Sequence, residues 1–134
     1  MAKLEEIEGI GPAFAGKLRA AGVDTIEELL TVGGSKKGRQ DLAEKSGVGE
    51  GHLLEWVNHA DLMRLKGVGP ETADLLEAAG VDSVAELAHR NAENLATKLD
   101  EVNAAKNLVN RVPNAGTIAG WIEEAKTLPK VVTH

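Results

Sequence analysis

The sequence contains no cysteine and no tyrosine, and aromatic residues make up only 2% of its 134 residues. Without cysteine, disulfide bonds and thiolate metal sites are excluded, and a reducing compartment is expected. Hydrophobic residues still amount to 43%, which is enough for a packed core. That core must consist mainly of leucine, isoleucine, valine and alanine, and the abundance of alanine and leucine favours closely packed helices.

The sequence also lacks a long apolar run and an N-terminal basic region followed by an apolar stretch. These absences predict a cytoplasmic protein with no membrane partner. Basic residues number 15 against 21 acidic ones, which gives a net charge of −6. An acidic chain does not bind nucleic acid through its overall charge, so any such binding requires a local basic patch.

Internal repetition is the strongest pattern in the sequence. IEGIGPAFAGKLRAAGVD at residues 7–24 is followed 58 residues later by LKGVGPETADLLEAAGVD at 65–82. Further along, the best alignment requires an offset of 65, so the second copy has gained seven residues near 89–110. The sequence therefore predicts a first repeat over residues 1–60 and a second over 61–134.

Each repeat is predicted to consist of short helices. Gly9, Ile10 and Gly11 interrupt one helix, and Pro12 suits the first position of the next because its missing N–H is not needed there. A second glycine turn follows at 47–49. No segment shows the period-two alternation of a β-strand. The predicted fold is all-α, with the two tandem repeats packed into one compact bundle.

The order of glycines and apolar residues in LEEIEGIGPAFAGKL, which LMRLKGVGPETADLL repeats, resembles the helix-hairpin-helix motif. Two such motifs per repeat resemble the tandem helix-hairpin-helix domains of DNA repair and recombination proteins. The whole chain is similar to a bacterial helix-hairpin-helix family of unknown function. The resemblance implies DNA binding without sequence specificity, and no cofactor other than a monovalent cation on the hairpin carbonyls.

A glycine turn that leads into a helix can bind an anion because the first N–H groups of the helix are unpaired and the helix dipole attracts negative charge. The apolar residue between the glycines anchors the turn in the core. Contacts of this kind hold phosphates and carry no information about base sequence. The candidate nucleic-acid-binding residues are the two turns of the first repeat and the basic residues near them: Gly9, Ile10, Gly11, Lys17, Arg19, Lys36, Lys37, Arg39, Lys45, Gly47, Val48 and Gly49.

The turns of the second repeat are less suited to phosphate. The turn at 67–69 is followed by Glu71, Asp74 and Glu77, and both glycines are replaced in the fourth turn. Binding to DNA is therefore predicted to be weak and sensitive to salt. The alternative is a protein-interaction or scaffolding module that has kept the fold and lost the phosphate role. The overall acidity favours this alternative.

No pattern in the sequence indicates catalysis. His52 and His59 lie seven residues apart on one predicted helix, about 10.5 Å along its axis, which is too far to share a metal ion. There is no nucleophile motif and no glycine-rich nucleotide loop. We expect neither an enzyme nor a metal site. Phe14 occupies an unconstrained position of the motif and is expected to be exposed, whereas Trp56 and Trp121 are expected in the core.

Overall fold

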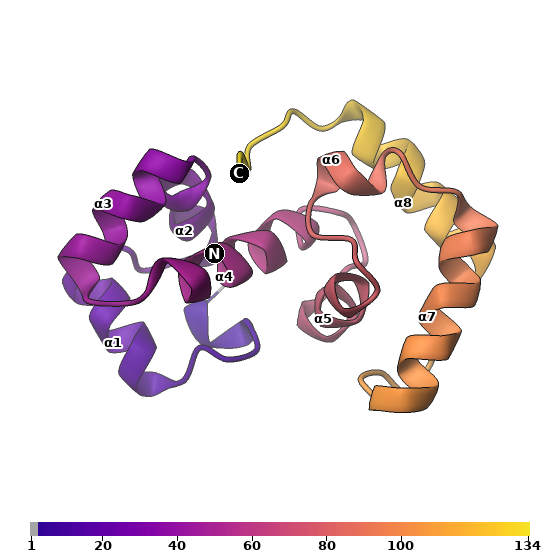
Figure 1. The fold of residues 1–134 in the computed structure, drawn as a ribbon, viewed down its shortest axis with the longest axis horizontal. Helices are drawn as coiled ribbons and strands as arrows, with labels where there is room; N and C mark the ends of the chain where they lie inside the picture. The colour runs from indigo at the N-terminus through magenta and orange to yellow at the C-terminus, as the bar shows by residue number, and fades with distance from the viewer. Residues whose placement is uncertain (1–2) are drawn as a thin grey trace. The chain divides into compact units, whose positions relative to one another are not determined.

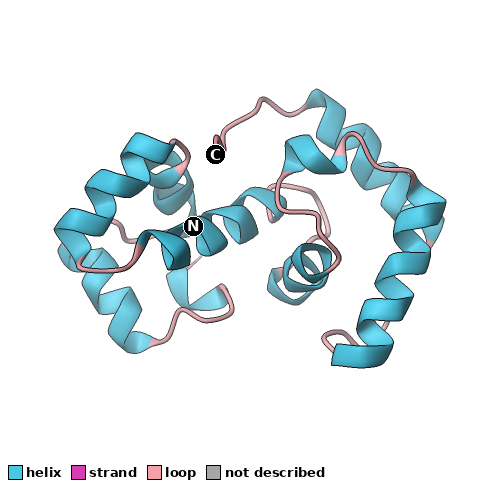
Figure 2. Ribbon diagram, viewed as in Figure 1, coloured by secondary structure: helices cyan, strands magenta, loops and turns pink. Residues whose placement is uncertain are grey.

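The computed structural model describes residues 3–134, and this part of the chain is all-helical, as predicted (Figures 1 and 2). A short 3-10 helix, η1 (Leu4–Glu6), comes first. The α-helices are α1 (Pro12–Ala20), α2 (Ile26–Gly33), α3 (Lys36–Ser46), α4 (Glu50–Leu62), α5 (Pro70–Ala78), α6 (Val84–Leu87), α7 (Ala92–Lys106) and α8 (Ala115–Thr127). The β-type pairing in the described residues is limited to an isolated bridge between Lys3 and Thr25.

The chain divides into two compact units. Unit 1 comprises Met1–Asp61 and Val131–His134, and unit 2 comprises Leu62–Lys130. The division falls near the end of α4, close to the predicted boundary between the repeats. The last four residues belong to unit 1, whereas the sequence placed them in the second repeat.

Each unit has its own aliphatic core. In unit 1, α3 packs against α1 and α2, and in unit 2, α7 packs against α8 and α5 (Figure 1). The largest fully buried side chains of unit 1 are Trp56, Leu4, Ile7, Leu18, Leu29, Leu42 and Leu53. The core of unit 2 is a cluster that includes Leu62, Leu65, Leu75, Leu76, Leu87, Leu95, Leu99 and Ile118. The scarcity of aromatic residues is thus compensated by leucine.

The two segments of similar sequence have similar local structure. Gly9 and Gly67 have φ angles of +91° and +89°, a region that strongly favours glycine, and each precedes a nine-residue helix that begins at proline. Beyond these segments the helices differ in length. Helix α7 has 15 residues, whereas α3 has 11. The organisation as two tandem repeats stays a prediction.

The last residues of the chain are held within unit 1 by hydrogen bonds to their main-chain groups. The Thr133 N–H donates to the Gly34 carbonyl at 2.8 Å, and the guanidinium of Arg39 donates to the carbonyl of Thr133. Val132 is buried. These contacts explain why the tail belongs to unit 1, and they involve backbone groups that no sequence pattern identifies.

Candidate nucleic-acid interface

The first glycine turn leaves helix amides without a partner inside the helix. Gly11 is the N-cap of α1 and has extended backbone angles, with φ −85° and ψ −179°. The Ala15 N–H is the donor to the Gly11 carbonyl, at 2.9 Å, and Pro12 has no N–H. The N–H groups of Ala13 and Phe14 therefore have no intrahelical acceptor. Gly11 has no side chain to cap them, and it is exposed.

The second glycine turn gives α4 a similar start. Gly47, with φ +77°, ends α3 in the left-handed conformation, and Gly49 is exposed. The Leu53 N–H donates to the Gly49 carbonyl at 3.1 Å, so the first three amides of α4 have no intrahelical acceptor. The Val48 amide is different, because it donates to the Ser46 hydroxyl at 3.1 Å. Val48, predicted as a nucleic-acid contact, is buried, and its amide is already engaged.

Aromatic side chains bring the starts of α1 and α4 into contact. Phe14 and His52 are each the third residue of their helix, and their ring centroids are 5.4 Å apart. Both rings also contact Trp56, at 5.0 Å for Phe14 and 5.6 Å for His52. Phe14 is half-buried rather than exposed, His52 is exposed, and Trp56 is in the core as predicted. The two helix starts, with their unpaired amides, therefore lie in the same region of unit 1.

This ring contact was missed in the sequence. The sequence does contain a shared spacing: a ring side chain stands three residues after the last glycine of each turn, Phe14 after Gly11 and His52 after Gly49. The spacing alone did not reveal that the two helix starts approach each other.

Five of the six predicted basic residues are exposed in unit 1, and four of these are lysines. Lys17 lies on α1, with its Nζ 5.8 Å from the centroid of the Phe14 ring. Lys36 and Lys37 occupy the first turn of α3, and Lys45 occupies its last turn. Lys36 lines a surface depression together with Gly51 at the start of α4. These lysines retain the predicted role as candidate phosphate contacts.

Arg19 is neutralised by carboxylates. Its guanidinium donates to both oxygens of Glu5, at 2.8 and 2.9 Å, and to Asp24 at 2.9 Å. These hydrogen bonds raise the pKa of Arg19 and lower the pKa of Glu5 from its ordinary value of 4.5. A cation shared by two carboxylates contributes little net charge to a phosphate. The prediction of Arg19 as a phosphate contact therefore loses its electrostatic basis.

Arg39 has a structural role in place of the predicted one. Only 4% of its surface is exposed, and it donates to the carbonyls of Gly33 and Gly34, both at 2.9 Å, and of Thr133. Burial lowers the pKa of Arg39, and the charge of Glu50 partly offsets this effect. With its guanidinium directed at main-chain oxygens, Arg39 is not available to a phosphate.

Acidic side chains lie beside the first glycine turn. Glu5, Glu6 and Glu8 line a depression together with residues 9–11. Glu5 is paired with Arg19, and Glu6 accepts the Lys3 N–H at 2.7 Å. The local charge at the first turn is therefore mixed, and the larger share of exposed lysine lies on α3.

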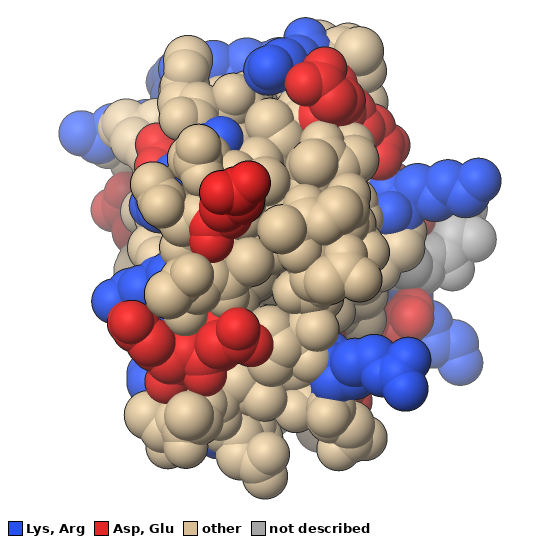
Figure 3. Space-filling model, turned by 90° about the vertical axis from the view of Figure 1, so that its right-hand side faces the viewer, with Lys and Arg blue, Asp and Glu red and all other residues tan. Residues whose placement is uncertain are grey.

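In unit 2 the start of α5 is uncapped like that of α1, because Gly69 is its N-cap, but other polar groups near the turns are occupied. The Lys66 N–H in the third turn donates to Glu124 at 3.1 Å, and Trp121 Nε1 donates to the Lys66 carbonyl at 3.0 Å. At the start of α8, the Asn114 side chain accepts the Thr117 N–H at 2.9 Å. The face turned toward the viewer in Figure 3, which carries α7, shows scattered charges of both signs and no continuous basic strip. Unit 2 thus offers one uncapped helix start after a glycine turn, at α5, where unit 1 offers two. Its positive charge is no smaller, since it carries eight basic residues against seven in unit 1.

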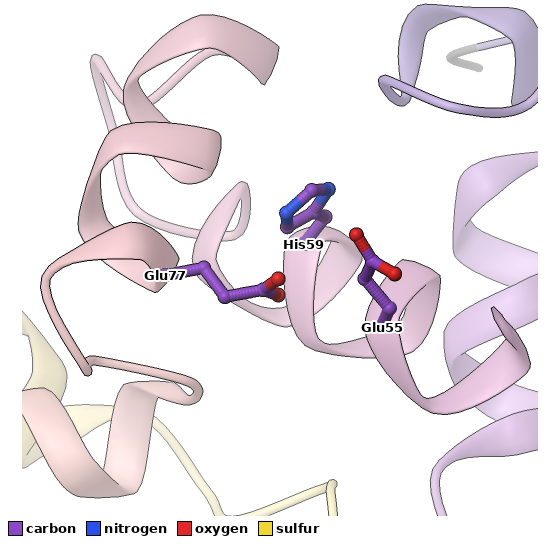
Figure 4. A group of neighbouring side chains, drawn as sticks. All are labelled: Glu55, His59 and Glu77. Atoms are coloured by element: carbon purple, nitrogen blue, oxygen red, sulfur yellow. The ribbon is translucent and has the colours of Figure 1, made fainter. Parts of the chain in front are cut away.

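A histidine and a carboxylate lie one turn apart on α4. Glu55 is exposed, His59 is buried, and their spacing places both on one side of the helix (Figure 4). Glu77, also labelled there, belongs to α5 of unit 2. Within one unit this group supplies at most two ligands, fewer than the three or four protein ligands that zinc sites use.

Comparison with known proteins identifies a family. Residues 8–128 match the sequence profile of a family described as Domain of unknown function (DUF4332). The chain belongs to the DUF4332 family. No curated protein and no solved structure matches it. Among the described residues of this DUF4332 protein, every helix is too short or too polar to cross a membrane.

Proposed function

We propose that this DUF4332 chain is a tandem helix-hairpin-helix protein whose unit 1 binds nucleic acid through phosphates, without sequence specificity. The observation that supports this best is the contact between Phe14 and His52, which brings the uncapped starts of α1 and α4 together. Unpaired amides at two helix starts form a surface that attracts anions, and successive phosphates of a nucleic acid are anions at regular spacing.

Positive charge for this interaction comes from lysine. The predicted lysines Lys17, Lys36, Lys37 and Lys45 are exposed, whereas both arginines of unit 1 are engaged within the protein. Neutralising each phosphate adds about 0.9 to the salt slope for duplex DNA, so two to four contacts predict a slope of about 2 to 4. Binding is therefore weak and is lost at moderate salt. A monovalent cation on the hairpin carbonyls stays a prediction.

Glycine substitutions test the role of the amides. An added Cβ at Gly11 or Gly69 meets no atom within 4 Å, and both residues are N-caps with extended backbone angles. Alanine is a poorer N-cap than glycine, so both substitutions should lower stability by a similar amount, about 1 kcal/mol or less. If a phosphate approaches the amides of α1, the methyl group of Gly11→Ala obstructs it, whereas Gly69→Ala in unit 2 is a matched control.

The measurement is fluorescence anisotropy with a labelled duplex at about 50 mM salt. We expect Gly11→Ala to weaken binding several-fold and Gly69→Ala to have no effect. A failure to bind at this salt concentration, or equal effects of the two substitutions, would contradict the proposal.

Charge reversal provides a second test. K36E/K37E and K98E/K106E change the net charge equally, and all four lysines are exposed, on α3 of unit 1 and α7 of unit 2 respectively. A local site predicts a loss of binding only for K36E/K37E, together with a smaller salt slope. Equal losses would mean that overall charge governs binding and that no local site exists.

A protein-interaction or scaffolding module is the second candidate, and the three glutamates that line the first turn favour it. The surface does not favour a conventional apolar interface. Val32, with 41% of its surface exposed, is the single exposed large hydrophobic residue in the described part of the chain. Recovery of a protein partner from nuclease-treated lysate, lost on mutation of the glutamates and retained in K36E/K37E, would favour this candidate.

A further inference from the structure

The contact between the Phe14 and His52 rings lies in unit 1, where it joins two uncapped helix starts. Trp56 aligns with Trp121, and both tryptophans are largely buried, which gives them a packing role in each unit. The positions that align with Phe14 and His52 are Thr72 and Thr117 in unit 2. Unit 2 buries its tryptophan without either ring. The Phe14 and His52 rings of unit 1 are therefore not required for packing of the tryptophan.

The surroundings of these rings suit a nucleobase. His52 is exposed and Phe14 half-buried, so ring surface is accessible beside the unpaired amides of α1 and α4. Lys17 Nζ lies 5.8 Å from the Phe14 centroid, which places a cation at the same ring. Sites for single-stranded nucleic acid combine these two features, because aromatic rings stack on bases while cations contact the backbone.

We infer that Phe14 and His52 form a stacking platform for an unpaired base, and that unit 1 prefers single-stranded over duplex nucleic acid. This inference rests on the proposed function, and it adds the class of nucleic acid. In a duplex the base faces are covered by their neighbours, so the rings gain no contact there. In a single strand one base stacks on the rings while the adjacent phosphates meet the amides and lysines.

The test compares two labelled probes that have the same phosphates: an oligothymidylate of about 12 nucleotides and an abasic oligonucleotide of equal length. Stacking of one base predicts at least about fivefold tighter binding of the oligothymidylate. We expect Phe14→Leu and His52→Ala each to reduce this ratio toward one, whereas Thr117→Ala in unit 2 leaves it unchanged. His52 is exposed, so its substitution keeps the test valid if Phe14→Leu perturbs folding.

A second measurement needs no substitution. The chain has two tryptophans, one in each unit, so the indole N–H resonances of Trp56 and Trp121 report on the two units separately. Oligothymidylate should shift the Trp56 signal and leave the Trp121 signal in place. Equal binding of both probes, with the ratio unaffected by His52→Ala, would overturn the stacking platform and leave phosphate binding intact. No binding of either probe or of duplex would overturn both.

Discussion

Replacing Arg39 by methionine should destabilise unit 1 without weakening nucleic-acid binding by the folded protein. Methionine retains the apolar stem of the side chain and removes the three hydrogen bonds to main-chain carbonyls. The Gly34 carbonyl keeps the Thr133 N–H as a donor, whereas the Gly33 and Thr133 carbonyls lose the guanidinium.

The magnitude follows from these two acceptors. Leaving the buried Gly33 carbonyl unpaired costs about 1–3 kcal/mol, whereas the carbonyl of the exposed Thr133 can bind water and costs less. Removing a cation that burial disfavours recovers part of this cost. We therefore expect Arg39→Met to lower the free energy of unfolding by about 2 kcal/mol. Lys37→Met, two residues earlier on the exposed side of α3, should change it by less than about 0.5 kcal/mol.

The assay is urea unfolding followed by the fluorescence of Trp56 in a Trp121→Phe background, so that the signal reports unit 1. The dissociation constant for an oligonucleotide is measured in parallel, at a temperature where both variants are folded. We expect opposite outcomes: Arg39→Met loses stability and keeps binding, and Lys37→Met keeps stability and loses binding. A loss of less than about 1 kcal/mol for Arg39→Met, or a binding defect equal to that of Lys37→Met, would refute the structural role of Arg39.

Three further predictions concern the turns and caps. Gly9→Ala should cost about 1 kcal/mol or more in unfolding free energy, because φ is +91° and the new Cβ would lie 3.3 Å from Trp56 Nε1, and urea titration against Gly11→Ala tests this. Asn114→Ala should cost about 1 kcal/mol through loss of the α8 cap, seen as a lower urea midpoint by Trp121 fluorescence, and an unchanged midpoint would contradict it. The lowered pKa of Glu5 means that its pairing with Arg19 stabilises the fold above pH 4.5 and that this contribution is lost as pH falls through the lowered pKa. The stability difference between wild type and Glu5→Gln should accordingly shrink on acidification, and a difference that stays constant would show that the pairing contributes nothing.

The α-helical fold could be predicted because its signals are local. The proline at position 12, the missing strand alternation and the alanine- and leucine-rich stretches each follow from the conformational preferences of a few neighbouring residues. The buried positions of Ile10 and Val68 were predicted for the same reason, since an apolar residue between two turn glycines is placed by its immediate neighbours.

The charges were predicted less well, because a basic residue in the sequence does not reveal its partner. Arg19 meets Glu5 from 14 residues earlier, and Arg39 meets Thr133 from 94 residues later. Nothing in the residues adjacent to either arginine distinguishes it from Lys17 or Lys37, which stay exposed. Proximity to a glycine turn in sequence was therefore a poor guide to the charge that a ligand would meet.

The sequence by itself determined where this chain turns and where its helices begin, because glycine, proline and capping residues act on the backbone beside them. Only the tertiary structure decided which amides and cations remain open to a ligand. That outcome depends on pairings between distant residues, through which Glu5, Thr133 and Glu124 occupy groups that would otherwise face solvent.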